Sequence, residues 1–142
     1  MIPRIVGTLA AVVLVGLGTV HCYWAAGADG RPTSRSRSAG VSLCSHQARR
    51  GPLLVALLLF AAALVLVGRL GLWGHWLPRW VFVAGTWTLV LVFGGRVVGD
   101  LRWFGLFKQV TGTPFAWWDT WVYVPLCALL ALAALLVAAL EP

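Results

Sequence analysis

The chain has 142 residues, of which 61% are hydrophobic and 11% are charged. A water-soluble domain of this length cannot hide so large an apolar fraction in one core, so we expect lipid to be its main solvent. Four spans of about 20 residues each would occupy more than half of the chain, which leaves little room for a soluble catalytic module. The formal charge of +7 favours anionic lipid headgroups as partners and not nucleic acid, because the basic residues stand between apolar runs and form no nucleic-acid-binding motif.

Four continuous apolar runs are rich in leucine and alanine, and they cover approximately residues 5–26, 52–70, 80–99 and 120–140. Strands are not expected, because the runs do not alternate and because exposed sheet edges are not tolerated in hydrocarbon. The sequence therefore predicts an all-α fold. We expect a single integral membrane domain over residues 1–142, built as a four-helix transmembrane bundle.

The first apolar run leaves an alternative open. Arg4 precedes the run and the small residues 26–28 follow it, as in a secretory signal peptide with its cleavage site. A membrane span is favoured, because the run is longer than the usual apolar core of a signal peptide. The bulky side chains of His21, Tyr23 and Trp24 would also crowd the cleavage site.

Residues 27–51 carry five arginines among serine, glycine and proline. Such a composition buries too little apolar surface to form a core. The sequence therefore predicts a flexible basic loop between the first two spans, held near the bilayer by anionic headgroups.

The distribution of basic residues predicts the orientation in the membrane. The first and third loops hold most of them, namely Arg31, Arg35, Arg37, Arg49, Arg50, Arg102 and Lys108. The opposite face has only Arg4, Arg69 and Arg79. By the positive-inside rule, we expect a multi-pass protein of the cell membrane with both termini outside the cytoplasm.

Polar residues at the ends of three spans are spaced so that they share helix faces. Trp24 follows His21 at i+3 near the end of the first span. Arg96 and Asp100 are four residues apart at the end of the third span, which predicts an ion pair between them. At the start of the fourth span, Asp119 suits a helix N-terminus and Tyr123 follows it at i+4.

The predicted topology brings these ends to the same depth, together with the third loop. The candidate ligand-binding residues are therefore His21, Trp24, Arg96, Asp100, Lys108, Asp119 and Tyr123. The opposite face offers only His75 and a few arginines. Two interpretations remain open: the polar cluster binds a ligand, or it is a lattice of ion pairs and caps that positions the helix ends.

Catalysis has less support than binding. His21 with a nearby carboxylate could act as a general base, but no nucleophile motif accompanies it. No phosphate-binding loop, nucleophile elbow or zinc signature is present, and the three histidines are scattered over both predicted faces. We therefore expect neither a metal nor a cofactor, and the sequence leaves open whether the protein is an enzyme.

An ordered set of motifs resembles a known family. The motifs are His21-Cys-Tyr-Trp-Ala-Ala-Gly27, Gly95-Arg-Val-Val-Gly-Asp100, Phe115-Ala-Trp-Trp-Asp119 and Tyr123-Val-Pro-Leu-Cys127. The chain resembles the bacterial membrane proteins grouped as domain of unknown function 3995, over nearly its whole length. The resemblance implies four spans and supplies no catalytic residues. Ala28 departs from the family pattern, which has a second glycine after the one at Gly27, so the turn there is less firmly assigned.

Three classes of function follow from the sequence. The first is a membrane protein that binds a lipid or small molecule at the polar cluster. The second is a membrane-embedded enzyme that uses His21 and a carboxylate. The third is a structural or accessory subunit, which would act as a homo-oligomer or with a membrane-complex partner.

Overall fold

The computed structural model describes residues 1–26, 41–99 and 117–141, and side chains within 41–49 are not described. The elements in chain order are α1 (Ile2–Ala25), α2 (Val41–Arg69), α3 (Arg79–Val98), the π-helix η1 (Asp119–Tyr123) and α5 (Val124–Leu140). Helix α5 continues directly from η1, so the described chain forms four membrane-length helices and no strand. This confirms the predicted all-α fold.

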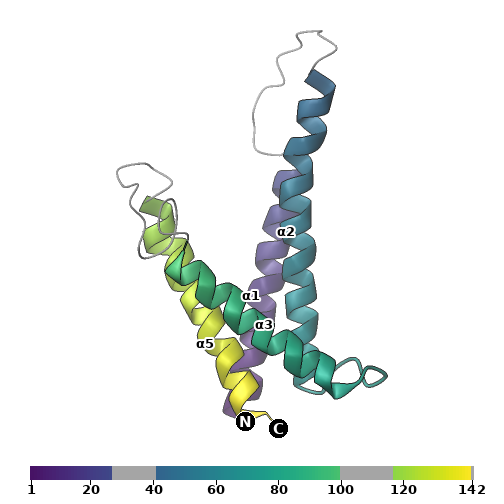
Figure 1. The fold of residues 1–142 in the computed structure, drawn as a ribbon, viewed down its shortest axis with the longest axis vertical. Coiled ribbons are helices and arrows are strands. Elements are labelled where there is room, and N and C mark those ends of the chain that lie inside the picture. The colour runs from purple at the N-terminus through teal and green to yellow at the C-terminus, as the bar shows by residue number, and fades with distance from the viewer. Residues whose placement is uncertain (27–40, 100–116, 142) are drawn as a thin grey trace.

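The four helices form two antiparallel pairs that cross and diverge towards one end (Figure 1). Helices α1 and α2 make the most extensive contact, and α3 packs mainly along α5. The two pairs meet through contacts of α1 with α5 and of α2 with α3. The ends that diverge are the end of α1, the start of α2, the end of α3 and the start of η1.

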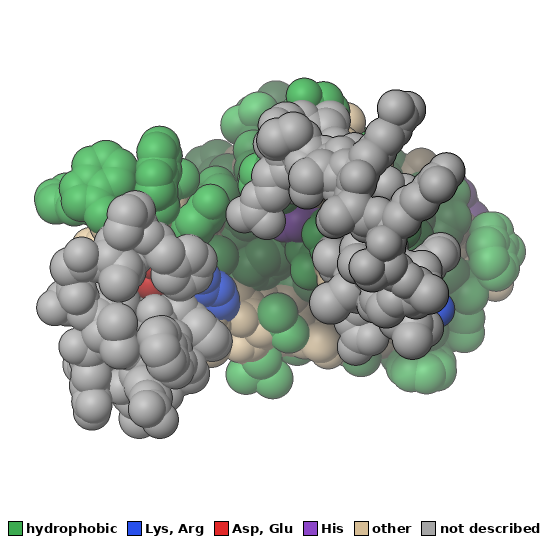
Figure 2. Space-filling view, turned by 90° about the horizontal axis from the view of Figure 1, so that it is seen from above, with side chains coloured by type: hydrophobic (Ala, Val, Ile, Leu, Met, Phe, Trp, Pro, Cys, Tyr) green, Lys and Arg blue, Asp and Glu red, His purple; other side chains and the backbone are tan. Residues whose placement is uncertain are grey.

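All four helices are long and apolar enough to cross a membrane, with spans at Ile2–Ala25, Arg50–Arg69, Arg79–Val98 and Asp119–Leu140. Large apolar side chains point outward on every helix, including Leu9, Leu58, Leu91 and Leu129, each at least 60% exposed. Figure 2 looks at the diverging end of the molecule and shows hydrophobic side chains over most of the described surface. Water would penalise such a surface, whereas lipid chains solvate it.

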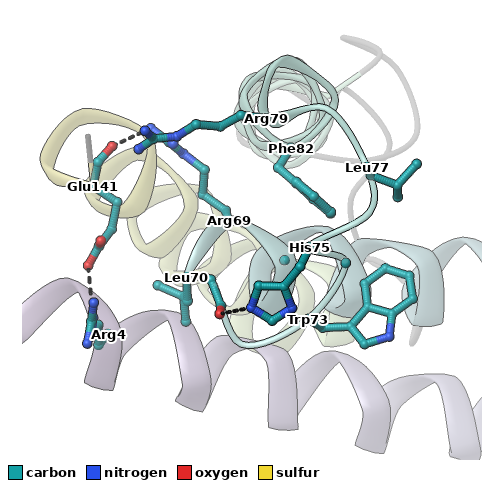
Figure 3. Close-up of a pocket in the computed structure, with 12 residues that line it drawn as sticks. Arg4, Arg69, Leu70, Trp73, His75, Leu77, Arg79, Phe82 and Glu141 are labelled. Carbon is teal, nitrogen blue, oxygen red and sulfur yellow. Dashed lines mark hydrogen bonds and ion pairs between the residues drawn. The ribbon is translucent and has the colours of Figure 1, made fainter.

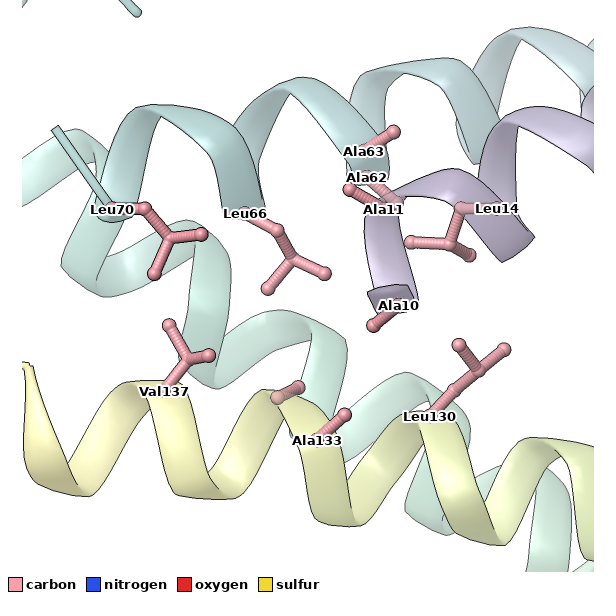
Figure 4. Packing of buried hydrophobic residues seen from close by; sticks show 11 residues of the cluster. Ala10, Ala11, Leu14, Ala62, Ala63, Leu66, Leu70, Leu130, Ala133 and Val137 are labelled. Atoms are coloured by element: carbon pink, nitrogen blue, oxygen red, sulfur yellow. The ribbon is translucent and has the colours of Figure 1, made fainter. Parts of the chain in front are cut away.

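The buried core is made largely of small residues from three helices (Figure 4). Leu14 of α1, Leu66 of α2 and Val137 of α5 are fully buried at its centre. Alanines surround them: Ala10, Ala11, Ala62, Ala63, Ala133 and Ala134. Small side chains let helix backbones approach closely, which is how helices gain packing energy in a membrane, where lipid removes the usual hydrophobic driving force. The first apolar run is therefore part of the core.

Glycine extends this close packing at the contact between α1 and α2. A Cβ atom on Gly18 would lie 2.8 Å from the Phe60 ring. On the other side of the core, a Cβ on Gly7 would lie 2.9 Å from Val137 Cγ2. Both positions need glycine because a neighbouring side chain occupies the space that a methyl group would fill.

The structure differs from the predicted basic loop over residues 27–51. Residues 27–40 lie outside the described part of the chain, but α2 already begins at Val41 and continues through Gly51 and Pro52. The stretch from Val41 to Arg50 contains neither glycine nor proline and includes leucine, glutamine, alanine and arginine, which favour helix. The serine and arginine content of this stretch predicted a loop, but the stretch is helical and lengthens α2 ahead of the second span.

Candidate functional site at the diverging helix ends

A buried ion pair connects the third and fourth spans. Nη2 of Arg96 donates a hydrogen bond to Oδ1 of Asp119 at 2.7 Å. The Asp119 side chain is fully buried, and that of Arg96 is 29% exposed. A carboxylate in this position is tolerated only with a cationic, hydrogen-bonding partner, because an isolated buried charge costs several kcal/mol.

The backbone around Asp119 is set by a proline further along the chain. Pro125 has no N–H and cannot donate to the carbonyl of Trp121, as a regular α-helix would require. The preceding turn is a π-helix, in which the N–H of Val124 bonds to the carbonyl of Asp119. Such single π turns recur at functional sites, because the wider turn changes where side chains project. Here Asp119 falls in the first turn of the fourth span, as predicted.

A pocket of about 350 Å³ lies next to this ion pair, between the two helix pairs. It is lined by Leu17, Val20, His21, Trp24, Val55, Leu59, Phe93, Arg96, Tyr123, Leu126, Cys127 and Leu130. All four spans contribute to the lining. Along the helices, His21, Arg96 and Tyr123 lie towards the diverging ends, and Leu17, Leu59 and Leu130 lie deeper. The polar lining residues therefore lie at the end of the pocket nearest the diverging helix ends, which we call its mouth, and apolar residues line the rest.

The hydrogen bonding of His21 determines what its ring offers to the pocket. Nδ1 lies 2.8 Å from the main-chain oxygen of Leu17, one turn earlier in α1. A carbonyl oxygen only accepts, so Nδ1 carries the hydrogen and Nε2 of the neutral ring is an acceptor. The ring also meets Trp24 edge to face, with centroids 5.0 Å apart. These two contacts hold the imidazole in one orientation.

Four of the seven candidate residues predicted from sequence line this one pocket: His21, Trp24, Arg96 and Tyr123. Asp119 does not line it but pairs with Arg96. Asp100 and Lys108 lie outside the described residues, and so does the predicted pairing of Arg96 with Asp100. Among the described residues, Arg96 bonds to Asp119, which is on another helix, 23 residues along the chain.

Sequence reasoning missed part of the pocket wall and an ion pair at the opposite end of the molecule. Val55 and Leu59 of α2 complete the pocket wall, and no sequence signal distinguishes them from other apolar residues of the second span. At the opposite end of the molecule, the acidic Glu141 pairs with Arg4, with 3.8 Å between Oε1 and Nε. A carboxylate directly after the fourth apolar run was the available signal. The opposite face therefore carries an ion pair in addition to the His75 and arginines predicted for it.

Within residues 1–26, 41–99 and 117–141, no group of three or more histidine, cysteine, aspartate or glutamate side chains is arranged to hold a metal ion. The polar side chains that line the pocket can form hydrogen bonds. His21 offers an acceptor, Tyr123 a hydroxyl, and Arg96 a guanidinium group whose charge is balanced by Asp119.

No curated protein and no solved structure matches the chain. A family model does match, described as protein of unknown function (DUF3995), over residues 14–134. The match extends from α1 into α5 and includes every residue that lines the pocket. It confirms the resemblance seen in the sequence motifs, and the chain belongs to this family.

Proposed function

We propose that the protein binds an uncharged amphiphile, a lipid or small molecule, in the pocket between the two helix pairs. The observation that carries the proposal is the convergence of His21, Arg96 and Tyr123 at the mouth of a pocket with an apolar interior. Its volume of about 350 Å³ falls at the small end of ligand sites. A few fixed polar groups in an apolar wall are the usual composition of such sites.

The charge of the ligand head follows from the ion pair. Because Asp119 balances Arg96, the formal charges of the described residues at the polar mouth cancel when His21 is neutral. A charged head would lose its hydration without gaining an opposite charge. A hydroxyl-bearing head suits the mouth better, since it donates to Nε2 of His21 and accepts from Tyr123 or Arg96.

Binding is favoured over catalysis by the same contacts. A general base of the histidine–carboxylate type needs the carboxylate within hydrogen-bond reach of the ring. His21 Nδ1 is bonded to the carbonyl of Leu17, and the described carboxylate closest to the pocket, Asp119, is bonded to Arg96. A structural subunit would need the ion pair but not the pocket.

The test compares single-chain amphiphiles that share one apolar chain and differ in the head: a hydroxyl, a carboxylate or a quaternary ammonium group. Binding to the folded state raises the melting temperature of protein reconstituted in nanodiscs. We expect the hydroxyl compound to give the largest rise. Tyr123→Phe should weaken its apparent affinity by about three- to tenfold, which corresponds to one neutral hydrogen bond.

Tyr23→Phe is the matched control, because it makes the same chemical change in α1 outside the pocket lining. It should leave the ligand-dependent rise unchanged. Equal responses of the two variants, or no rise with any of the three heads, would rule out this pocket as the binding site and favour an accessory subunit.

We also propose that the diverging helix ends face the cytoplasm and that both termini lie on the outer side of the cell membrane. The basic loops would then lie against anionic headgroups. The support is the excess of arginine and lysine in the connections at that end.

A further inference from the structure

A second pocket of about 350 Å³ lies at the opposite end of the molecule, where both chain ends meet the connection between α2 and α3 (Figure 3). Its polar lining residues are Arg4, Arg69, Arg79, His75 and Glu141. They come from the start of α1, the end of α2, the start of α3, the connection and the end of α5.

The charges around this pocket are unequal. Arg4 pairs with the carboxylate of Glu141, whereas Arg69 donates to the main-chain oxygen of Glu141. That second bond engages a carbonyl group and not a carboxylate (Figure 3). Of the described side chains that line the pocket, three are guanidinium groups and one is a carboxylate, which gives a formal charge of +2 with His75 neutral. Arg69 and Arg79 lie close enough for their like charges to interact.

The pocket is built on a fixed backbone. Gly71 and Gly74 have φ angles of +73° and +78°, which other residues rarely adopt. His75 donates from Nε2 to the carbonyl of Gly71 at 3.1 Å, so its ring is held across the turn. Phe82 is 6% exposed and fills the space beside Gly74, where a Cβ would lie 2.4 Å from the ring. The arginines thus surround an apolar, preformed floor, next to which charge interactions are stronger than in water.

We propose that Arg4, Arg69 and Arg79 form a binding site for a phosphate group. Guanidinium groups bind phosphate oxygens through paired, charge-assisted hydrogen bonds, and the net positive lining supplies the attraction. The site lies where α2 ends and α3 begins, beside the exposed Trp76 and Trp80, which is headgroup depth for a spanning helix. The phosphate belongs either to an anionic phospholipid or to a soluble phosphate compound.

The experiment measures the melting temperature of the protein in neutral detergent at constant ionic strength. One arm titrates inorganic phosphate against chloride, and the other titrates short-chain phosphatidylglycerol against phosphatidylcholine. A rise with inorganic phosphate assigns the site to a soluble anion, and a rise with phosphatidylglycerol alone assigns it to a lipid headgroup. Either result supports the site, and no rise in either arm overturns it.

Substitutions then test whether the rise in melting temperature arises from binding at this pocket. Arg79→Gln should weaken the apparent affinity about tenfold. Glu141→Gln should strengthen it, because it removes the carboxylate that competes with the phosphate among the described lining residues. Arg50→Gln is the control, since it removes an exposed charge at the other end of the second span. An equal loss in Arg79→Gln and Arg50→Gln, or weaker binding in Glu141→Gln, would contradict the assignment.

Discussion

Replacement of Asp119 by asparagine tests the ion pair on which the candidate site depends. Asparagine keeps the volume of the side chain but removes its charge. The Arg96 guanidinium would then lie at the end of a membrane span without the 2.7 Å contact to a carboxylate. Because Asp119 is fully buried, water cannot substitute for the lost charge at its position.

The magnitude follows from the burial of the two partners. Opposite unit charges about 4 Å apart attract by about 4 kcal/mol at an effective dielectric constant of about 20. Loss of one partner of a fully buried pair costs about 3–5 kcal/mol. The Arg96 side chain is 29% exposed, so it can recover part of this by extending towards the headgroups. We therefore expect Asp119→Asn to lower the free energy of unfolding by about 2–4 kcal/mol.

The assay is reversible unfolding in mixed micelles, followed by far-UV circular dichroism as the denaturing detergent is increased. Glu141→Gln is the control for loss of a carboxylate. Its partner Arg4 is 69% exposed and 3.8 Å away, so the cost should be about 0–1 kcal/mol. A double-mutant cycle with Arg96→Gln should give a coupling energy above about 0.5 kcal/mol. Additive effects of Asp119→Asn and Arg96→Gln would refute the pairing.

Two further predictions concern packing and orientation. Gly68→Ala should destabilise the protein by about 1–3 kcal/mol in the same unfolding assay, because its Cβ would lie 2.1 Å from Phe82. Gly16→Ala is the control. It has open space around it and should be neutral or stabilising by up to about 1 kcal/mol. Orientation can be tested in intact cells with variants of a protein from which the three native cysteines have been removed. An impermeant thiol reagent should label the Leu72→Cys variant and not the Ser38→Cys variant. The reverse labelling pattern would invert the proposed topology.

The fold could be predicted because a bilayer permits few solutions. A spanning segment must satisfy its own backbone hydrogen bonds and match the hydrocarbon thickness, so a continuous apolar run of sufficient length is almost always a helix. The helices beginning at Ile2, Arg79 and Asp119 accordingly coincide closely with the apolar runs. The start of α2 could not be found in this way, because Val41–Arg50 is polar and its helicity depends on local propensity and on continuity with the span.

The candidate site was predictable only within single helices. The spacing of His21 and Trp24 indicated a shared face, and their rings lie 5.0 Å apart. The pairing of Arg96 with Asp119 depends on which helices are neighbours. Local spacing predicted a pair with Asp100, which lies outside the described residues, but gave no sign that the packing of α3 on α5 and the π turn before Pro125 bring Asp119 to the guanidinium. Contacts between helices are set by packing, which hydropathy does not encode.

The ligands that we propose for the two pockets differ because the charges of the described residues are balanced differently. At one end, Asp119 neutralises Arg96, and His21 presents Nε2 as an acceptor, so the polar groups select by hydrogen-bond pattern. At the other end, the described lining holds three arginines and one carboxylate, so the proposed ligand is an anion. Neither distinction follows from the net charge of +7, which counts every arginine alike. The role of each arginine depends on whether the fold brings a carboxylate to it. The chain has only four acidic residues, and their placement is the basis on which we propose a neutral ligand for one pocket and an anion for the other.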